Sequence, residues 1–250
     1  MANATGGRDT GMIICGDALT ELRKLPDESV YMVLTDIPYG EVNHKSGGLR
    51  LLNRGIVNKC TIDPSELVVQ ITRIMRGSAY IFCGTMQISP IIESFRRLGL
   101  TTRLGVWDKT NPSPMNGDKL WLSGLEFCVF ARKPKAVFNE FCKKALWESP
   151  RGCSKIHPTE KPMALLGRLI RASSLPGETV LDCFMGSGAV GIVAKELGRD
   201  FIGIELNAEY CKMAERRIAG VAYQMPLAKW ESQKAGVVQE SPSVKVSDAD

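Results

Sequence analysis

Two stretches of this chain end a largely apolar run with an acidic residue, and both contain residue types that could do chemistry. The first is Asp36-Ile-Pro-Tyr-Gly40, which follows residues 29–35. The second is Asp182-Cys-Phe-Met-Gly-Ser-Gly188. Gly186 and Gly188 lack a side chain, so a ligand can lie against the backbone and reach the start of the following helix. A strand, a glycine turn and a helix in this order are typical of sites that hold nucleotide-like ligands.

The residues after the glycine turn narrow the class of ligand. A second apolar run, residues 201–204, ends in Glu205, at about the spacing of 20 residues expected of a partner for ribose hydroxyls. Gly186, Gly188 and Gly191 keep the G-x-G-x-x-G register that dinucleotide-binding turns also have, so the turn alone does not exclude NAD. A turn of this kind suits a nucleoside such as S-adenosylmethionine, and NAD is the other candidate ligand. The alternative is an ordinary turn between a strand and a helix.

Asp36 to Tyr39 could activate the exocyclic amine of a nucleic-acid base. Such an amine is a poor nucleophile because its lone pair is delocalised into the ring, and acceptors aimed at its N–H bonds localise that lone pair. Asp36 offers a carboxylate, the backbone carbonyls next to Pro38 offer a second acceptor, and Tyr39 offers a face for stacking. The base must first leave the double helix. A strand-ending turn is the alternative, since Asp, Pro and Gly are turn residues.

Composition is that of an ordinary globular protein and excludes several classes of function. The chain has 250 residues, 44% of them hydrophobic, and a net charge of +5, which permits a polyanionic partner without requiring one. Eight cysteines without a C-x-x-C pair, and only two histidines, argue against a metal site. Cys15, Cys83 and Cys128 stand in apolar runs and are expected to be buried thiols. We expect a cytoplasmic protein, since no apolar run approaches membrane length.

The elements that must position these residues alternate along the chain. Strands are expected at residues 12–15, 29–35, 78–83, 101–107, 125–131, 179–182 and 201–204, with helical patterns between most of them. This alternation predicts an α/β fold with a mostly parallel twisted sheet and helices on both faces. Asp36 and Asp182 are then expected to meet at one sheet edge. We expect a flexible arm at 1–11, one domain at 12–220 and a polar, disordered tail at 221–250.

The ordered set of motifs resembles the DNA amino-methyltransferases of the N6-adenine/N4-cytosine type, in the permuted order in which the catalytic tetrapeptide precedes the cofactor loop. The matching motifs span roughly residues 12–218. Each motif alone is a weak indicator of the family, whereas their occurrence in the family order is a strong one. The motifs are residues 14–17, 35–40, 106–109, 127–133, 157–162, 181–188 and 201–205. The resemblance implies a Rossmann-like methyltransferase fold and transfer of a methyl group from S-adenosylmethionine to a base of DNA.

The resemblance also implies a role for each matching residue. The residues that would hold the target amine and base are Asp36, Ile37, Pro38 and Tyr39. The cofactor-binding residues would be Asp17, Thr159, Lys161, Asp182, Phe184, Gly186, Gly188 and Glu205. Among these, Glu205 would take the ribose hydroxyls, and Thr159 and Lys161 would approach the methionine end. A helix cap and a solvated lysine are the alternatives for the last two.

One departure from the family pattern affects the expected chemistry. The family usually has two prolines in the tetrapeptide, and Ile37 replaces the first. A carbonyl remains there, but the fixed φ of proline is lost, so preorganisation is expected to be poorer. An aspartate in first place is commoner in the adenine branch, which favours N6 of adenine over N4 of cytosine. The chain has no Pro-Cys pair, which disfavours methylation at carbon 5 of cytosine.

Two basic segments, 41–62 and 132–157, are the candidate DNA-contacting regions. The basic residues expected to contact phosphates are Lys45, Arg50, Arg54, Lys143, Lys144 and Arg151, with a solvated surface as the alternative. The alternative functions are N4-cytosine or RNA methylation, a catalytically weak DNA-binding relative, and an NAD-dependent oxidoreductase. The sequence leaves open the recognised DNA site, a restriction-modification role beside a nuclease, and the oligomeric state, a homodimer included.

Overall fold

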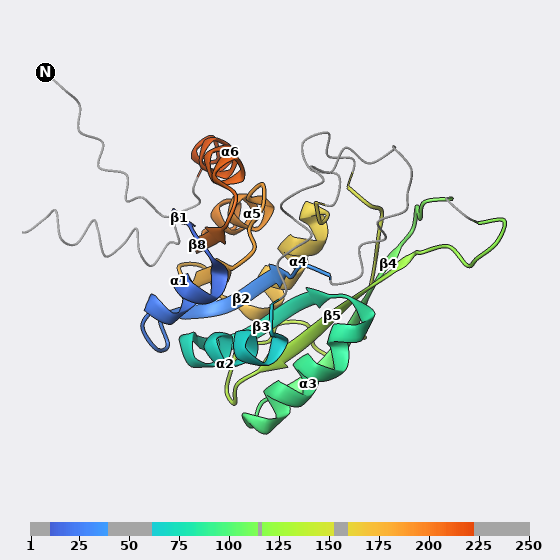
Figure 1. Cartoon of the computed structure of the whole chain (residues 1–250), viewed down its shortest axis with the longest axis horizontal. Helices are drawn as coiled ribbons and strands as arrows, with labels where there is room; N and C mark the ends of the chain where they lie inside the picture. The colour runs from blue at the N-terminus through green and yellow to red at the C-terminus, as the bar shows by residue number, and fades with distance from the viewer. Residues whose placement is uncertain (1–10, 40–61, 115–116, 153–159, 223–250) are drawn as a thin grey trace, which may run out of the picture.

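The computed structural model describes residues 11–39, 62–114, 117–152 and 160–222. The predicted arm at 1–11 and tail at 221–250 lie almost wholly outside these ranges, as does the basic segment at 41–62. Within the described ranges the chain forms an eight-stranded sheet with helices packed on it (Figure 1).

The sheet is mostly parallel, as the sequence predicts. Its strands are β1 (Gly11–Cys15), β2 (Val30–Asp36), β3 (Met75–Cys83), β4 (Thr101–Lys109), β5 (Leu125–Arg132), β6 (Leu146–Ser149), β7 (Thr179–Asp182) and β8 (Asp200–Glu205). They lie in the order β1-β8-β7-β2-β3-β5-β4-β6. Of the strands described, β5 alone is reversed, because it pairs antiparallel with both β3 and β4.

Three of the six described helices begin at a residue whose side chain caps the first turn. The six helices are α1 (Ala18–Lys24), α2 (Pro64–Ile74), α3 (Ile88–Arg97), α4 (Met163–Ser173), α5 (Ala189–Glu196) and α6 (Ala208–Ala219). The side chains of Asp17, Asp63 and Asn207 accept backbone N–H bonds in the first turns of α1, α2 and α6. None of the helices in the described ranges combines the length and apolarity needed to cross a bilayer.

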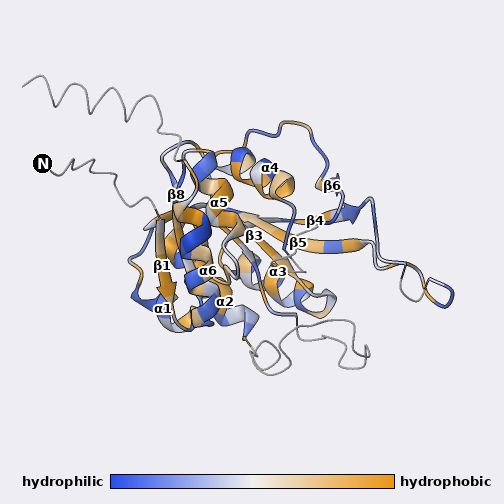
Figure 2. Cartoon of the chain, turned by 90° about the horizontal axis from the view of Figure 1, so that it is seen from above, coloured by the Kyte–Doolittle hydropathy of each residue, from blue (hydrophilic) through white to orange (hydrophobic). Residues whose placement is uncertain are grey.

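The helices cover the sheet on both faces because successive strand residues point to opposite sides. Val33 of β2 belongs to the core that α1, α2 and α3 cover, whereas its neighbours Met32 and Leu34 belong to the core under α4, α5 and α6. In Figure 2 the strands are largely hydrophobic, whereas the helices around them carry both hydrophobic and hydrophilic residues. Most of these helices bury one face and expose the other, whereas α5 is buried all round over residues 189–194.

The order of the strands creates a switch point between β7 and β2. From β2 the sheet continues in one direction through β3, and from β7 it continues in the other direction through β8 and β1. Ligands of open α/β sheets bind outside the carboxyl ends of the strands at such a point. The two acidic strand ends that the sequence singles out, Asp36 of β2 and Asp182 of β7, flank it.

Two features differ from what the sequence predicts. Strand β6 lies inside the basic segment 132–157, where no strand was expected. Four residues are too few to show the alternation of apolar and polar residues that identifies a strand. The strand forms through its parallel pairing with β4. Cys83 and Cys128 are buried as predicted, but the prediction for Cys15 is wrong, because this thiol lies exposed at the end of the edge strand β1.

A glycine in β4 anchors β6. A Cβ atom at Gly105 would lie 2.3 Å from Cη2 of the buried Trp147 of β6, and Trp107 Nε1 donates a hydrogen bond to the Ser149 carbonyl over 3.0 Å. The absence of a side chain at Gly105 therefore lets the Trp147 ring lie across β4. This contact stabilises the edge of the sheet.

We predict that Gly105→Ala lowers the free energy of unfolding by about 1–3 kcal/mol, because the bulky Trp147 ring must move. Urea denaturation measures the change. Gly11→Ala is the matched control, since the nearest atom to its Cβ would be 3.7 Å away. Equal stability of the two variants would contradict this packing.

Candidate active site

A buried hydrogen bond joins the two strand ends at the switch point. β2 and β7 pair in parallel, with Val33 opposite Leu181. Near the carboxyl ends of these strands the hydroxyl of Thr35 donates to Asp182 Oδ1 over 2.7 Å. Both of these residues are buried. The sequence-based expectation that the two acidic ends lie at one edge is therefore confirmed.

Burial changes the pKa of the Asp182 carboxyl group. Burial raises its pKa to about 7, although the hydrogen bonds from Thr35 and from the backbone N–H of Phe184 act in the opposite direction. The nearby charges of Asp36 and Glu205 raise the pKa further. Asp182 thus titrates near neutral pH, and a cationic group beside it would favour its charged form.

The glycine turn holds the carboxylate of Glu205. The backbone N–H of Gly186 donates to Glu205 Oε2 over 2.9 Å, and the N–H of Asn207 donates to Oε1 over 2.8 Å. Gly186 and Gly188 have φ angles of 52° and 85°, which residues with a side chain rarely adopt. A Cβ atom at Gly188 would also lie 2.9 Å from Cβ of Ala214. Both glycines are therefore required by the backbone, and the turn fixes Glu205 at the end of β8.

Asp17 lies at the end of β1 and caps α1. Its Oδ1 accepts bonds from the backbone N–H and the hydroxyl of Thr20, over 2.9 and 2.7 Å. The backbone N–H of Gly16 donates to the Glu205 carbonyl over 2.9 Å, which ties the ends of β1 and β8 together. The predicted contact of Asp17 with a cofactor stays a prediction.

A row of four carboxylates results, from Asp17 through Glu205 and Asp182 to Asp36, at the ends of the adjacent strands β1, β8, β7 and β2. Carboxylates accept hydrogen bonds from hydroxyl and amino groups and repel phosphates. This donor set therefore fits a nucleoside with a positive charge, such as S-adenosylmethionine, and does not fit the pyrophosphate of NAD.

The carboxylate of Asp36 is oriented by two donors. The Tyr39 hydroxyl donates to Asp36 Oδ1 over 2.8 Å, and the Lys161 ammonium donates to Oδ2 over 2.5 Å. Burial and the negative charge of Asp36 raise the pKa of Tyr39 well above its ordinary value, so this phenol keeps its proton. Both carboxylate oxygens are thus fixed in direction, and each retains a further lone pair for a substrate amine.

The backbone around Ile37 is held by bonds that compensate for the missing proline. Its side chain is buried in the core, and its N–H donates to the Phe82 carbonyl over 3.1 Å, a bond that a proline could not make. The Pro38 carbonyl accepts from Gln87 Nε2 over 3.0 Å, and Gln87 Oε1 accepts from the Gly84 N–H. These hydrogen bonds anchor the tetrapeptide in the structure, and the poorer preorganisation expected from Ile37 stays a prediction.

Lys161 lies between two carboxylates, which rules out the alternative of a solvated lysine. Its ammonium lies 2.5 Å from Asp36 Oδ2 and 2.9 Å from Glu126 Oε2, with 8% of its side chain exposed. Glu126 also pairs with Lys109 over 2.7 Å. Burial would lower the pKa of Lys161, but the charges of Asp36 and Glu126 outweigh it and raise this pKa above its ordinary value. The role of Lys161 at the cofactor stays a prediction.

Sequence reasoning missed Glu126 and Gln87. Glu126 stands near the start of β5, and because β5 is reversed, its first residues reach the same edge as the last residues of β2 and β4. The sequence signal that could have identified Glu126 is its position directly before the motif at 127–133. Gln87 stands in a short 3-10 turn at Thr85–Gln87 and had no signal in the sequence.

The motif at 157–162 is tied to the glycine turn. The Ser187 hydroxyl donates to Glu160 Oε1 over 2.9 Å, and Arg217 Nη1 donates to the same oxygen over 2.7 Å. This brings Lys161 beside the turn. Thr159, the other residue predicted here, lies outside the described residues. Phe184 is partly buried against the core, and its predicted role at the cofactor stays a prediction.

The predicted DNA-contacting residues are placed only in part. Lys143 and Lys144 are exposed. The backbone N–H and Nε of Arg151 both donate to Asn111, over 2.6 and 2.9 Å, which ties the segment after β6 to the loop after β4. The remaining three residues, Lys45, Arg50 and Arg54, lie outside the described part of the chain.

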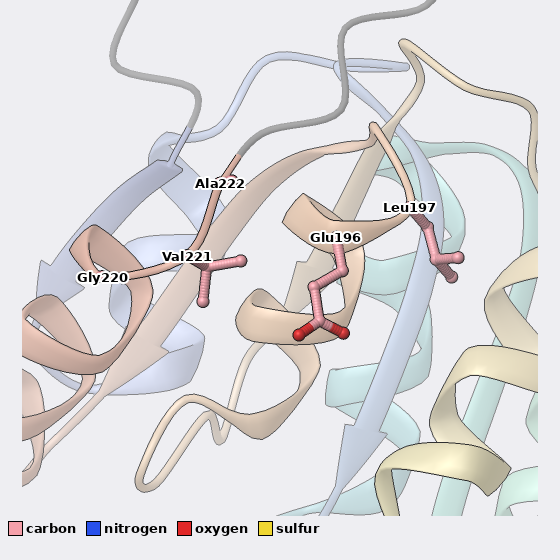
Figure 3. Close-up of a pocket in the computed structure, with 5 residues that line it drawn as sticks. All are labelled: Glu196, Leu197, Gly220, Val221 and Ala222. Atoms are coloured by element: carbon pink, nitrogen blue, oxygen red, sulfur yellow. The ribbon is translucent and has the colours of Figure 1, made fainter.

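A separate hollow lies away from this edge. It measures about 590 Å³ and is lined by Glu196, Leu197, Gly220, Val221 and Ala222 (Figure 3). These residues follow the ends of α5 and α6, and Leu197 shortly precedes the start of β8. The hollow is therefore at the amino ends of the strands, opposite the four carboxylates, and does not belong to the candidate site.

Comparisons with known proteins agree with this geometry. The sequence model of the N6/N4 type of DNA methylase matches residues 30–216. The chain is 30% identical, over an alignment of 283 residues, to the DNA adenine methyltransferase YhdJ of Escherichia coli K12, covering 98% of this chain and 95% of that protein. It is 28% identical to the type II methyltransferase M2.LlaDCHI of Lactococcus lactis subsp. cremoris, covering 84% and 90% of the two chains.

Solved structures show the same fold. The complex of M1.HpyAVI with S-adenosylmethionine superposes with a TM-score of 0.65 at 29% identity, covering 83% of this chain and 98% of that one. The cytosine-N4-specific PvuII DNA methyltransferase, at 18% identity, shares the fold with a TM-score of 0.64, covering 92% and 93%. The chain belongs to the N6/N4 family of DNA methylases. It is an S-adenosylmethionine-dependent DNA methyltransferase with a Rossmann-like fold.

We predict that Asp182→Asn changes how stability depends on pH. The folded protein keeps the Asp182 proton up to about pH 7, whereas the unfolded chain loses it near pH 3.8, so wild-type stability is lost as the pH rises through this window. Asparagine retains the acceptor for Thr35 but has no proton to lose. Between pH 4 and 7.5 the variant should gain roughly 4 kcal/mol relative to wild type. Urea denaturation across this range measures the difference, and parallel profiles would contradict the burial of a titrating carboxyl.

Proposed function

We propose that this protein methylates the exocyclic N6 of adenine in DNA. The observation that carries the proposal is an oriented aspartate, Asp36, next to the row of carboxylates that suits the cofactor. An aspartate in first place of the tetrapeptide favours adenine over cytosine. The Escherichia coli relative, at 30% identity over nearly the whole chain, is named a DNA adenine methyltransferase.

The described residues suit a direct transfer with a base turned out of the duplex. S-adenosylmethionine, when bound, supplies an electrophilic methyl group. Asp36 accepts one N–H bond of the target amine and the Ile37 carbonyl accepts the other, which returns the lone pair to the nitrogen. The ring of Tyr39 offers the stacking face. Because Lys161 and the Tyr39 hydroxyl hold the Asp36 carboxylate, it needs little reorganisation when the base arrives.

The cofactor is proposed to lie along the row of carboxylates. Glu205 would accept the ribose hydroxyls, and Asp17 would lie near the adenine amine. Gly186 and Gly188 leave room for the ligand against the backbone. Asp182, Phe184, Thr159 and Lys161 would lie toward the methionine end. This assignment follows from the resemblance and from the fixed position of Glu205.

The DNA is proposed to approach the edge at which β4 ends and β5 begins. The connection between these strands carries a fully exposed Trp121, with exposed Leu120 and Lys119 beside it. Lys143 and Lys144 add positive charge, and Lys45, Arg50 and Arg54 are proposed to do so from the segment after the tetrapeptide. Aromatic and basic side chains together are typical of surfaces that stack on bases and bind phosphates.

N4 methylation of cytosine is the second candidate, since the PvuII enzyme specific for that position shares the fold. We also propose that the protein acts in a bacterial cytoplasm, since the relatives from Escherichia coli and Lactococcus lactis are bacterial proteins. A homodimer is the alternative to a single chain as the active form.

We predict that the wild-type protein transfers label from S-adenosylmethionine to DNA and that digestion to nucleosides yields N6-methyladenine. Asp36→Ala should abolish this transfer, because the amine loses its acceptor, while cofactor affinity measured by calorimetry changes little. Asp27→Ala removes an exposed aspartate that pairs with Arg73 and should retain activity. Labelled N4-methylcytosine would contradict the adenine assignment, and turnover by Asp36→Ala would remove Asp36 from the mechanism.

We predict that DNA binding weakens with salt, with a slope of log affinity against log salt near −0.9 for each phosphate contact. Lys144→Ala should make the slope less steep by about 1, because one phosphate contact is lost. Lys24→Ala on α1, a lysine paired with Glu21, is the control. Fluorescence anisotropy at several salt concentrations measures the slopes. A binding affinity that does not depend on salt would contradict this DNA-binding face.

A further inference from the structure

Four charged side chains form a partly buried network at the catalytic edge. Lys161 contacts Asp36 and Glu126, and Glu126 in turn contacts Lys109. The side chains of Lys161, Lys109 and Glu126 are 8%, 11% and 21% exposed, so solvent screens their charges weakly. The network holds two positive and two negative charges and is neutral as a whole.

Glu126 and Lys109 are the two members of this network without a role in the proposed chemistry, and Glu126 is the one that contacts Lys161. The Oε2 atom of Glu126 is buried and lies 2.9 Å from the Lys161 ammonium, so the two groups form a close ion pair. Burial would raise the pKa of Glu126, but Lys161 and Lys109 outweigh it and lower this pKa below its ordinary value. Glu126 is therefore a charged group at neutral pH.

The position of Lys161 creates an electrostatic problem for the cofactor. Its ammonium donates a hydrogen bond to the carboxylate of Asp36, which must face the target amine. The same ammonium lies 5.1 Å from the centre of the Phe82 ring and 5.7 Å from the centre of the Tyr39 ring. A sulfonium ion that delivers a methyl group to an amine held by Asp36 would lie near this ammonium. Two positive charges in a weakly screened site repel each other unless a negative charge balances one of them.

We propose that Glu126 is a positioning residue that neutralises Lys161, so that the site accepts the positive sulfonium of the cofactor. This proposal rests on the proposed function and extends it to a residue outside the family motifs. Lys161 can then orient Asp36 without repelling the cofactor. Lys109 pairs with Glu126 and not with Asp36, so it sets the charge of the network without touching the catalytic carboxylate.

Comparing S-adenosylmethionine with S-adenosylhomocysteine separates the effect of charge from that of shape. S-adenosylhomocysteine lacks the methyl group and has a neutral thioether in place of the sulfonium. Glu126→Gln keeps the size of the side chain and gives the network a net charge of +1. We expect this variant to bind S-adenosylmethionine about tenfold more weakly, while affinity for S-adenosylhomocysteine changes less than about twofold. A residue that only held the fold would change both affinities alike.

Two further variants keep the proposal falsifiable. Glu126→Gln combined with Lys109→Met is neutral again and should restore the wild-type ratio of the two affinities. Lys109→Met alone gives a net charge of −1 and should raise the affinity for S-adenosylmethionine relative to S-adenosylhomocysteine. Glu140→Gln, which breaks the distant pair with Arg168, is the control and should leave the ratio unchanged.

Isothermal titration calorimetry of the full chain with each compound measures these affinities. A ratio that follows the net charge of the network across the variants supports the proposal. Equal changes for both compounds, or an unchanged ratio in Glu126→Gln and Lys109→Met, overturn it. If the wild-type chain bound neither compound, the proposed function itself would fail, whereas wild-type binding with an invariant ratio would remove only the role of Glu126.

Discussion

The hydrogen bond from the Thr35 hydroxyl to Asp182 is the contact on which the site depends. It closes the switch point between β2 and β7, where two strands far apart in the chain run side by side. A buried bond to an ionisable group is worth about 1.5–3 kcal/mol, and an unpaired carboxyl there would cost more. Because this bond fixes the spacing of the two strand ends, the place where a cofactor lies and the carboxylate that receives the base are parts of one rigid edge.

Along this edge, charge is organised in two zones. On the side of β1, β8 and β7, carboxylates stand without a basic partner in their described hydrogen bonds, and backbone N–H groups hold Glu205 in place. On the side of β2 and β5, the carboxylates of Asp36 and Glu126 are each paired with a lysine. The first zone suits hydroxyl and amino groups of a nucleoside, and the second keeps Asp36 oriented while its charge is balanced. The reversal of β5 makes the second zone possible, because it brings Glu126 to the edge.

The sequence predicted the fold and the central pair of strand ends because both follow from local patterns. Apolar runs ending at Asp36 and Asp182 indicated parallel strands, and the glycines at 186 and 188 are required by positive φ angles. Lys161 was found through its motif, but its burial between two carboxylates was not, because burial depends on the neighbouring strands. Strand β6, Gln87 and Glu126 were missed for the same reason. Each owes its place to pairing or contacts with residues distant in the chain, and no local periodicity encodes them.

The most direct measurement is a crystal structure of the full chain with S-adenosylhomocysteine bound. The account predicts that its ribose hydroxyls contact Glu205, that it lies against Gly186 and Gly188, and that its sulfur faces the Asp36 carboxylate. A nucleoside bound elsewhere on the molecule, or a sulfur atom directed away from Asp36, would contradict the claim that the paired ends of β2 and β7 form a single methyl-transfer site.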